Sequence, residues 1–125
     1  LQKEATGKGV VWLTVCSSAP GKQGHYDADT WNEKLKEAKA AGTALLIDAD
    51  GKVGKMYGAE TTPNMYVIDK KGQLVYAGAI DDNSSWNPNT VEGARNYVRE
   101  AVNAVLEGDE PEVTSTKPYG CSVKY

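Results

Sequence analysis

The side chains that could carry covalent chemistry in this chain are two thiols, Cys16 and Cys121, near opposite ends of the 125 residues. The thiolate is the reactive form of cysteine, and an apolar setting disfavours it. Cys16 closes a predicted apolar strand, so an inert, buried thiol is the default for it. Cys121 lies in a predicted irregular tail, where Lys117 and Lys124 favour the thiolate. It is either an unimportant free thiol or a redox-active one, and a Cys16–Cys121 disulfide is a third alternative.

Other polar residues give weaker signals. His25 stands in a glycine-rich loop, where a solvated imidazole is favoured over a general base. Asp81 and Asp82 are adjacent in a predicted turn, and such carboxylates usually solvate the turn. We therefore expect none of the three to be catalytic.

Metal and phosphate sites are disfavoured by the sequence. Two cysteines and one histidine are too few for a structural zinc site. The segment that begins at Asp48 has Lys52 and Val53 where a calcium loop needs a ligand and a glycine. The adjoining "GKVGK" lacks the spacing and the Ser or Thr of a phosphate-binding loop.

A proline at the start of an apolar run raises a separate question. In "ETTPNMYVID", Pro63 precedes a strand-like segment, and proline cannot donate a hydrogen bond to a sheet. Pro63 either begins a strand, or follows a cis peptide bond that turns the backbone of Thr62 outward. From the residues alone the first alternative is favoured, because only about 5–6% of X–Pro bonds in folded proteins are cis.

Apolar periodicity predicts the elements of the first half. The opening nine residues resemble the last turns of a helix closed by Gly7 or Gly9. Val10–Val15 predicts a strand covered on both faces. A helix follows, capped by Thr30 with Glu33 in a capping box and ended by Gly42. A second strand, "TALLID", makes a βαβ unit with parallel strands.

The second half predicts a hairpin and a helix. A short helix is expected around Val53–Tyr57, then strands Asn64–Asp69 and Gln73–Ile80 joined by "KKG". The last helix is expected to start at Asn89, with Glu92 completing the cap, and to stop at Gly108. Its expected apolar face contains Val91, Ala94, Val98, Ala101, Val102 and Val105.

This order of elements, with Thr-Pro before the hairpin, resembles the redoxin branch of the thioredoxin fold. The branch includes alkyl hydroperoxide reductase/thiol-specific antioxidant (peroxiredoxin-like) and thiol–disulfide interchange proteins. The carrying segments are "VVWLTVCSSAPGKQGH", "LLIDADGKVGKMYGAETTPNMYVIDKKGQLVYAGAIDD" and "KPYGCSVKY". The resemblance implies an α/β fold, a thioredoxin-like three-layer α/β/α domain with a mixed sheet over residues 1–110. Residues 111–125 form a tail that carries Cys121.

The resemblance implies a thiol-dependent oxidoreductase that reduces peroxides or disulfides. Its usual strand and nucleophilic-cysteine helix have no counterpart here, so we expect the chain to be N-terminally truncated, with the principal nucleophile upstream of Leu1. Cys121, and less strongly Cys16, are the catalytic candidates; Thr62 and a cis Pro63 would bind substrate. No metal, flavin or nucleotide is implied. The alternative is a non-catalytic module that binds a partner through the cis-proline edge.

Charge and hydropathy limit the partners. The net charge is −3, the pI is about 5.1 and basic residues are scattered, so no nucleic-acid surface is predicted. No apolar stretch approaches the roughly 20 residues that cross a bilayer. We expect a partner thiol/disulfide protein or a peroxide, and homo-oligomers through exposed sheet edges. By analogy with exported members of the branch, a periplasmic or other extracytoplasmic location is expected.

Overall fold

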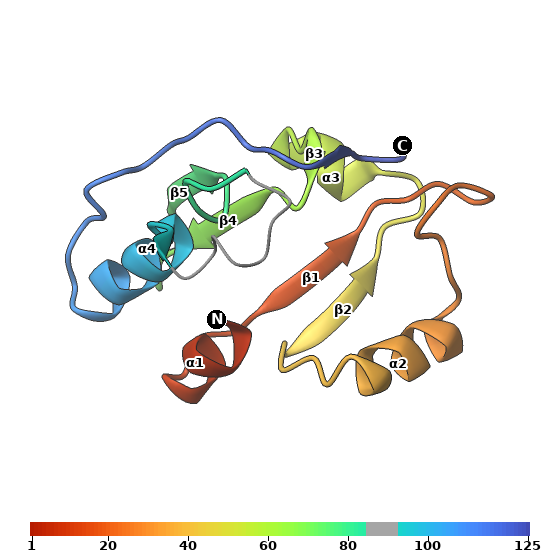
Figure 1. Cartoon of the computed structure of the whole chain (residues 1–125), viewed down its shortest axis with the longest axis horizontal. Coiled ribbons are helices and arrows are strands. Elements are labelled where there is room, and N and C mark those ends of the chain that lie inside the picture. Colours follow the sequence, from red (N-terminus) through yellow and green to blue (C-terminus); the bar gives the residue numbers. More distant parts are fainter. Residues whose placement is uncertain (85–92) are drawn as a thin grey trace. The chain divides into compact units, whose positions relative to one another are not determined.

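Two units make up the chain in the computed structural model, which describes residues 1–84 and 93–125 (Figure 1). Unit 1 consists of Leu1–Ala59 together with Val123–Tyr125, and unit 2 of Glu60–Ser122. The tail thus contributes residues to both units.

Unit 1 contains the predicted βαβ motif. Its elements are α1 (Gln2–Gly7), β1 (Leu13–Cys16), α2 (Ala28–Glu37), β2 (Ala44–Ile47) and α3 (Lys52–Tyr57). β1 and β2 are parallel, with Leu13 opposite Ala44 and Cys16 opposite Ile47. The parallel pair, the helix that ends at Gly7 and the short helix after β2 are confirmed.

The prediction that the first strand is covered on both faces is wrong. The strand begins at Leu13, and Val11, Leu13 and Val15 are 67%, 53% and 40% exposed. These side chains alternate with Trp12 and Thr14, which are half-buried. The exposed side chains therefore lie on one face of the β1–β2 pair, and that face is open to solvent.

The predicted cap of α2 is also wrong. Asp27 is the N-cap, and its carboxylate accepts a 2.8 Å hydrogen bond from the amide of Thr30. Thr30 therefore lies inside the helix. The helix ends at Glu37, before Gly42, because Lys39 adopts a left-handed conformation (φ 52°) and turns the chain away.

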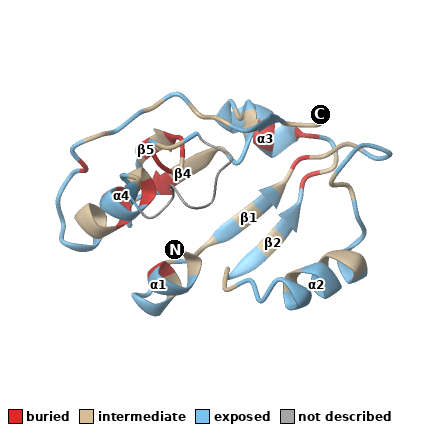
Figure 2. Cartoon of the chain, viewed as in Figure 1, coloured by how far each residue is buried: buried red, intermediate tan, exposed pale blue. Residues whose placement is uncertain are grey.

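Unit 2 contains the predicted hairpin. Its elements are β3 (Thr61–Thr62), β4 (Met65–Ile68), β5 (Leu74–Gly78), α4 (Tyr97–Leu106) and β6 (Cys121–Ser122). β4 and β5 are antiparallel, and the Asp69 carboxylate closes their turn by accepting from the amides of Lys71 and Gln73, both at 2.9 Å. α4 packs against β4 and β5. Figure 2 shows buried residues on these three elements, and the apolar ones are Val67, Tyr76, Val98, Ala101 and Val102.

The helix of unit 2 keeps its predicted face but starts elsewhere. Asn89, Val91 and Glu92 lie outside the described residues. Asn96 is the N-cap of α4, and its side chain accepts from the amide of Arg99 at 2.8 Å. The members of the predicted face that are buried are Val98, Ala101 and Val102.

The fold class that results is mixed α/β with small sheets. The described strands form one parallel and two antiparallel pairs. Within residues 1–84 and 93–125, no helix has the length and hydropathy needed to cross a membrane.

Candidate functional site

The peptide bond between Thr62 and Pro63 is cis. This confirms the alternative that the residues alone disfavoured and the family resemblance favoured. The Thr61 hydroxyl donates to the carbonyl of Pro63 at 2.8 Å, and the Asn64 side chain accepts from the amide of Glu60 at 3.1 Å. Local side chains thus fix the turn from β3 into β4.

The edge beside the cis proline is occupied by the tail of the chain. β3 and β6 are antiparallel, with Thr62 opposite Cys121 and Thr61 opposite Ser122. Thr62 and Cys121 are both exposed. An incoming peptide that paired with Thr62 would have to replace the segment that carries Cys121.

A glycine makes this pairing sterically feasible. Gly120 has φ +134°, and a Cβ built on it would lie 2.2 Å from the carbonyl oxygen of Thr62. Any side chain at this position would collide with backbone, which cannot move as a side chain can. The requirement comes from a contact 58 positions away in sequence (residue 62 to residue 120), so it could not be predicted from the local pattern around Gly120.

The tail is anchored before it reaches β6. The Thr116 hydroxyl accepts from the amide of Ala79 at 2.9 Å and lies 2.6 Å from the hydroxyl of Tyr76. The Tyr119 hydroxyl donates to the carboxylate of Asp81. Burial raises the pKa of Tyr119 to about 12, together with this hydrogen bond and the nearby carboxylates. Tyr119 therefore stays a neutral donor at physiological pH.

The two adjacent carboxylates have structural partners. Asp81 is buried and also accepts from the amide of Asn83 at 3.0 Å, and Asp82 accepts from the amide of Arg95 at 2.8 Å. These contacts tie the segment after β5 to the start of α4 and to the tail. The expectation that both carboxylates solvate the turn is wrong for Asp81, which is buried and accepts from Tyr119 of the tail.

Cys16 is a half-buried free thiol at the end of β1, and Cys121 is a free exposed one. The Cys16 sulfur donates to the carbonyl of Gly24 at 3.3 Å. His25, in the same loop, has Nδ1 3.2 Å from the carbonyl of Ser18. Both side chains therefore hold the loop after β1 in place.

A buried carboxylate that sequence analysis assigned to no site organises the same end of unit 1. Asp48 is 7% exposed and accepts from the Ser17 hydroxyl at 2.6 Å and from the amides of Gly54 and Val53 at 2.9 and 3.1 Å. Burial raises its pKa, but the hydrogen bonds from Ser17, Gly54 and Val53 outweigh burial, so the pKa lies below its ordinary value. Asp48 joins the ends of β1 and β2 to the start of α3.

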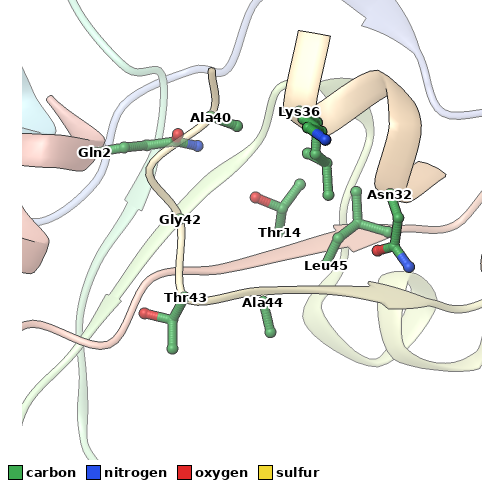
Figure 3. A pocket seen from close by; sticks show the side chains of 10 residues that line it. Gln2, Thr14, Asn32, Lys36, Ala40, Gly42, Thr43, Ala44 and Leu45 are labelled. Carbon is green, nitrogen blue, oxygen red and sulfur yellow. The ribbon is translucent and has the colours of Figure 1, made fainter. Parts of the chain in front are cut away.

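A hollow of about 290 Å³ lies between α2 and the β1–β2 pair (Figure 3). Asn32 and Lys36 of α2 border one side, and Thr14 and Leu45 of the strands the other. The described residues that line it include no cysteine, histidine or carboxylate. Elsewhere in the described chain, no three potential metal-ligating side chains cluster. The cis-proline edge with Cys121 is thus the stronger candidate site.

We expect the two thiols to differ in reactivity. With DTNB at neutral pH, Cys121 should be modified about tenfold faster than Cys16 or more, because Cys16 is half-buried and hydrogen-bonded. Mass spectrometry of the tryptic peptides assigns the modified residue. In denaturant the two rates should converge, whereas equal rates in the folded protein would contradict the assignment.

Comparison with known proteins finds solved structures similar to this chain but no named activity. No family model matches the chain, and no curated protein does. A crystal structure of a hypothetical protein from Sinorhizobium meliloti 1021 is similar with a TM-score of 0.82 and 30% identity, over 98% of this chain and 65% of that one. An uncharacterised conserved protein from Geobacillus kaustophilus gives 0.81 and 27%, over 98% and 63%. This chain therefore shares its fold with two solved proteins and spans less than two thirds of the length of either.

Proposed function

We propose that the protein is a thiol-dependent oxidoreductase of the redoxin type, on a three-layer thioredoxin-like domain. The observation that supports this most is the position of Cys121 opposite Thr62, next to the cis Pro63. In the fold that the sequence resembles, the cis proline faces the nucleophilic thiol, and the residue before it pairs with an extended substrate. Here the tail presents a thiol at that pairing position.

In the proposed reaction with a peroxide, a nucleophilic thiolate attacks one peroxide oxygen. The O–O bond breaks, the other oxygen leaves as water or an alcohol after protonation, and the thiolate becomes a sulfenic acid. Cys121 then attacks the sulfenic sulfur, water leaves, and a disulfide forms. The family resemblance assigns the first thiolate to a segment outside Leu1–Tyr125.

With a disulfide substrate the same two thiols act in sequence. The nucleophilic thiolate attacks one sulfur of the substrate and the S–S bond breaks. One substrate thiol leaves after protonation, and a mixed disulfide forms between the nucleophile and the other substrate sulfur. Cys121 attacks the mixed disulfide and releases the second substrate thiol. In both cases a partner thiol protein supplies two electrons to reduce the resulting disulfide. No metal, flavin or nucleotide enters these steps.

The test is a pair of cysteine substitutions in the protein that carries this domain with its nucleophile. We expect Cys121→Ser to lower turnover in peroxide-consumption or insulin-reduction assays about tenfold or more, because an intramolecular thiol at millimolar effective concentration is lost. Cys16→Ser is the matched control and should leave turnover within about twofold, since its sulfur holds a loop. Unchanged turnover in Cys121→Ser would remove the resolving role.

A second candidate function is a binding module that uses the same edge without chemistry. The pairing of β3 with β6 supports it, because an extended segment of the chain itself pairs with Thr61 and Thr62. Alkylating both thiols separates the two functions. Partner binding that survives alkylation, in a protein without reductase activity, would select the binding module.

The proposal includes a periplasmic or otherwise extracytoplasmic location, where an oxidising environment suits a disulfide cycle. Its substrates are a peroxide or a thiol/disulfide partner protein. Cell fractionation tests the location directly.

We further propose that the chain self-associates through the outer edge of β1. The carbonyls of Trp12 and Cys16 accept from Ala44 and Asp48 of the neighbouring segment, so the main-chain groups of Leu13 and Val15 face the other edge. No strand of the described residues pairs there. Such an edge with exposed apolar side chains favours association.

Sedimentation analysis measures this association. We expect Val15→Lys to shift the distribution toward monomer, because a lysine on an edge strand opposes pairing. Met56→Lys is the control, since Met56 is 70% exposed but lies on helix α3. A distribution that neither substitution changes would exclude the β1 edge.

A further inference from the structure

Two glycines of the "GKVGK" segment form a slot that holds an aromatic ring. Gly51 and Gly54 are buried. A Cβ on Gly51 would lie 2.6 Å from Cδ1 of Tyr125, and a Cβ on Gly54 would lie 2.6 Å from the hydroxyl oxygen of Ser17 and 2.9 Å from that of Tyr125. Figure 1 shows this end of the chain beside α3. Gly51 also needs a left-handed conformation, with φ +70°. The two glycines of this segment, which does not match a phosphate-binding loop, thus leave room for the side chain of Tyr125.

Polar groups fix both ends of the tyrosine in this slot. The Tyr125 hydroxyl donates to the carbonyl of Ala59 at 2.7 Å, and the Lys55 ammonium lies 5.2 Å from the ring centroid. The Lys22 ammonium donates to the main-chain oxygen of Tyr125 at 2.6 Å. Burial, and secondarily the charge of Asp48, raises the pKa of Tyr125, so its hydroxyl remains a donor at neutral pH.

The segment before the tyrosine is held through its backbone. The amide of Ala19 donates to the carbonyl of Lys124 at 2.7 Å. This hydrogen bond is made by the main chain of residue 124 and not by its side chain, and it requires one direction of the bound segment. The contacts in the slot therefore fit a two-residue extended segment whose second residue is tyrosine.

We propose that the surface formed by Ala19, Lys22, Gly51, Gly54 and Ala59 is a tyrosine-binding site for an extended peptide segment, which the chain's own Lys124–Tyr125 fills reversibly. The ligand class is a tyrosine whose preceding residue offers a free carbonyl. This site goes beyond the proposed redox function and needs neither cysteine.

Reversibility follows from how little of the tail holds it there. Val123–Tyr125 is the whole contribution of the tail to unit 1. The residues just before it, Cys121 and Ser122, are exposed and pair with two residues of β3. Ordering the end of the tail costs conformational entropy that the few contacts of Val123–Tyr125 must offset, so we expect the docked and released states to exchange readily.

The experiment uses the full chain with Tyr125→Ala, which empties the slot, and the peptide acetyl-Ser-Val-Lys-Tyr added in trans. In ¹⁵N-labelled Tyr125→Ala we expect amide exchange at Ala19 to accelerate about tenfold or more over wild type. Adding the peptide should restore protection and shift the Gly51, Gly54 and Ala59 amide resonances in a saturable way. Acetyl-Ser-Val-Lys-Phe should bind roughly two- to tenfold more weakly, since one hydrogen bond is lost.

Two results would overturn the proposal. One is Ala19 exchange that is the same in Tyr125→Ala and wild type. The other is equal shifts with acetyl-Ser-Val-Lys-Tyr and acetyl-Ser-Val-Lys-Ala. Met56→Ala, on the same helix but exposed, controls for general loosening of α3. Because the peptide and the readout contain no thiol, failure here would leave the redox proposal standing, and the reverse also holds.

Discussion

Replacing Asp48 by alanine is expected to lower the free energy of unfolding by about 3 kcal/mol. The substitution removes the acceptor for the Ser17 hydroxyl and for the amides of Val53 and Gly54. Ser17 and Gly54 are buried, so their donors cannot turn to water without opening the structure. Urea denaturation followed by circular dichroism measures the loss.

Asp50→Ala is the matched control for Asp48→Ala. Asp50 lies two residues on, is exposed, and accepts from the amide of Lys52 at 3.1 Å, so we expect a loss under about 1 kcal/mol. Ser17→Ala should fall between the two, because it removes one of the three hydrogen bonds to the carboxylate. Equal midpoints for Asp48→Ala and Asp50→Ala would mean that the buried carboxylate does not stabilise unit 1.

The same carboxylate gives stability a pH dependence of known sign. The pKa of Asp48 is lower in the folded chain than its ordinary value of 3.8, because hydrogen bonds from Ser17, Gly54 and Val53 outweigh the opposing effect of burial. Its contribution is therefore fully present above the unfolded pKa and is lost as the pH falls through the folded one. Wild type should lose its stability advantage over Asp48→Asn below about pH 4.

How much of the fold could be predicted depended on the range of the interactions involved. The hairpin β4–β5 was predictable because "KKG" between two apolar runs is a local signal that its Asp69–Gly72 turn realises. The exposure of Val15 was not predictable, since the burial of each face of a strand depends on which other elements pack against it. The cap of α2 was predicted wrongly, because Thr30 and Glu33 match a capping box in sequence whereas the backbone geometry makes Asp27 the N-cap.

The candidate site divides in the same way. The cis bond at Pro63 followed from a family resemblance, and Cys121 was singled out by its residue type. Its pairing with Thr62 was not predictable, because a two-residue strand has no periodic pattern. Likewise, the role of Gly51 and Gly54 could not be predicted from their own segment, which was compared only with a phosphate-binding loop. The Tyr125 side chain that they accommodate lies some 70 residues further along the chain (residue 54 to residue 125).

Gly120→Ala is expected to detach the strand that carries Cys121 from the cis-proline edge. The new Cβ would overlap the carbonyl oxygen of Thr62, 2.2 Å away, and alanine disfavours φ +134°. Strain of about 1–3 kcal/mol is comparable to what a two-residue strand pair contributes. We therefore expect amide exchange in the peptide containing Cys121 and Ser122 to rise about tenfold to a hundredfold, by hydrogen-exchange mass spectrometry.

Global stability separates this local effect from unfolding. The midpoint of urea denaturation should change little, because Thr116 and Tyr119 anchor the tail independently of Gly120. Gly72→Ala, in the same unit, is the control: its φ is +80° and no atom lies within 4 Å of the added Cβ, so it tests the backbone conformation without the collision. If Gly72→Ala accelerates exchange at Cys121 as much as Gly120→Ala does, the contact with Thr62 does not hold the strand.

If Cys121 resolves an oxidised nucleophile, its position opposite Thr62 should matter as well as its sulfur. Gly120→Ala keeps the Cys121 thiol but is expected to move it away from Thr62. We therefore expect turnover to fall toward that of Cys121→Ser while the thiol content stays unchanged. Turnover equal to wild type, with the strand shown to be detached, would mean that the cis-proline edge and the thiol act separately. The redox role would then rest on Cys121 alone, and the edge would be a binding surface.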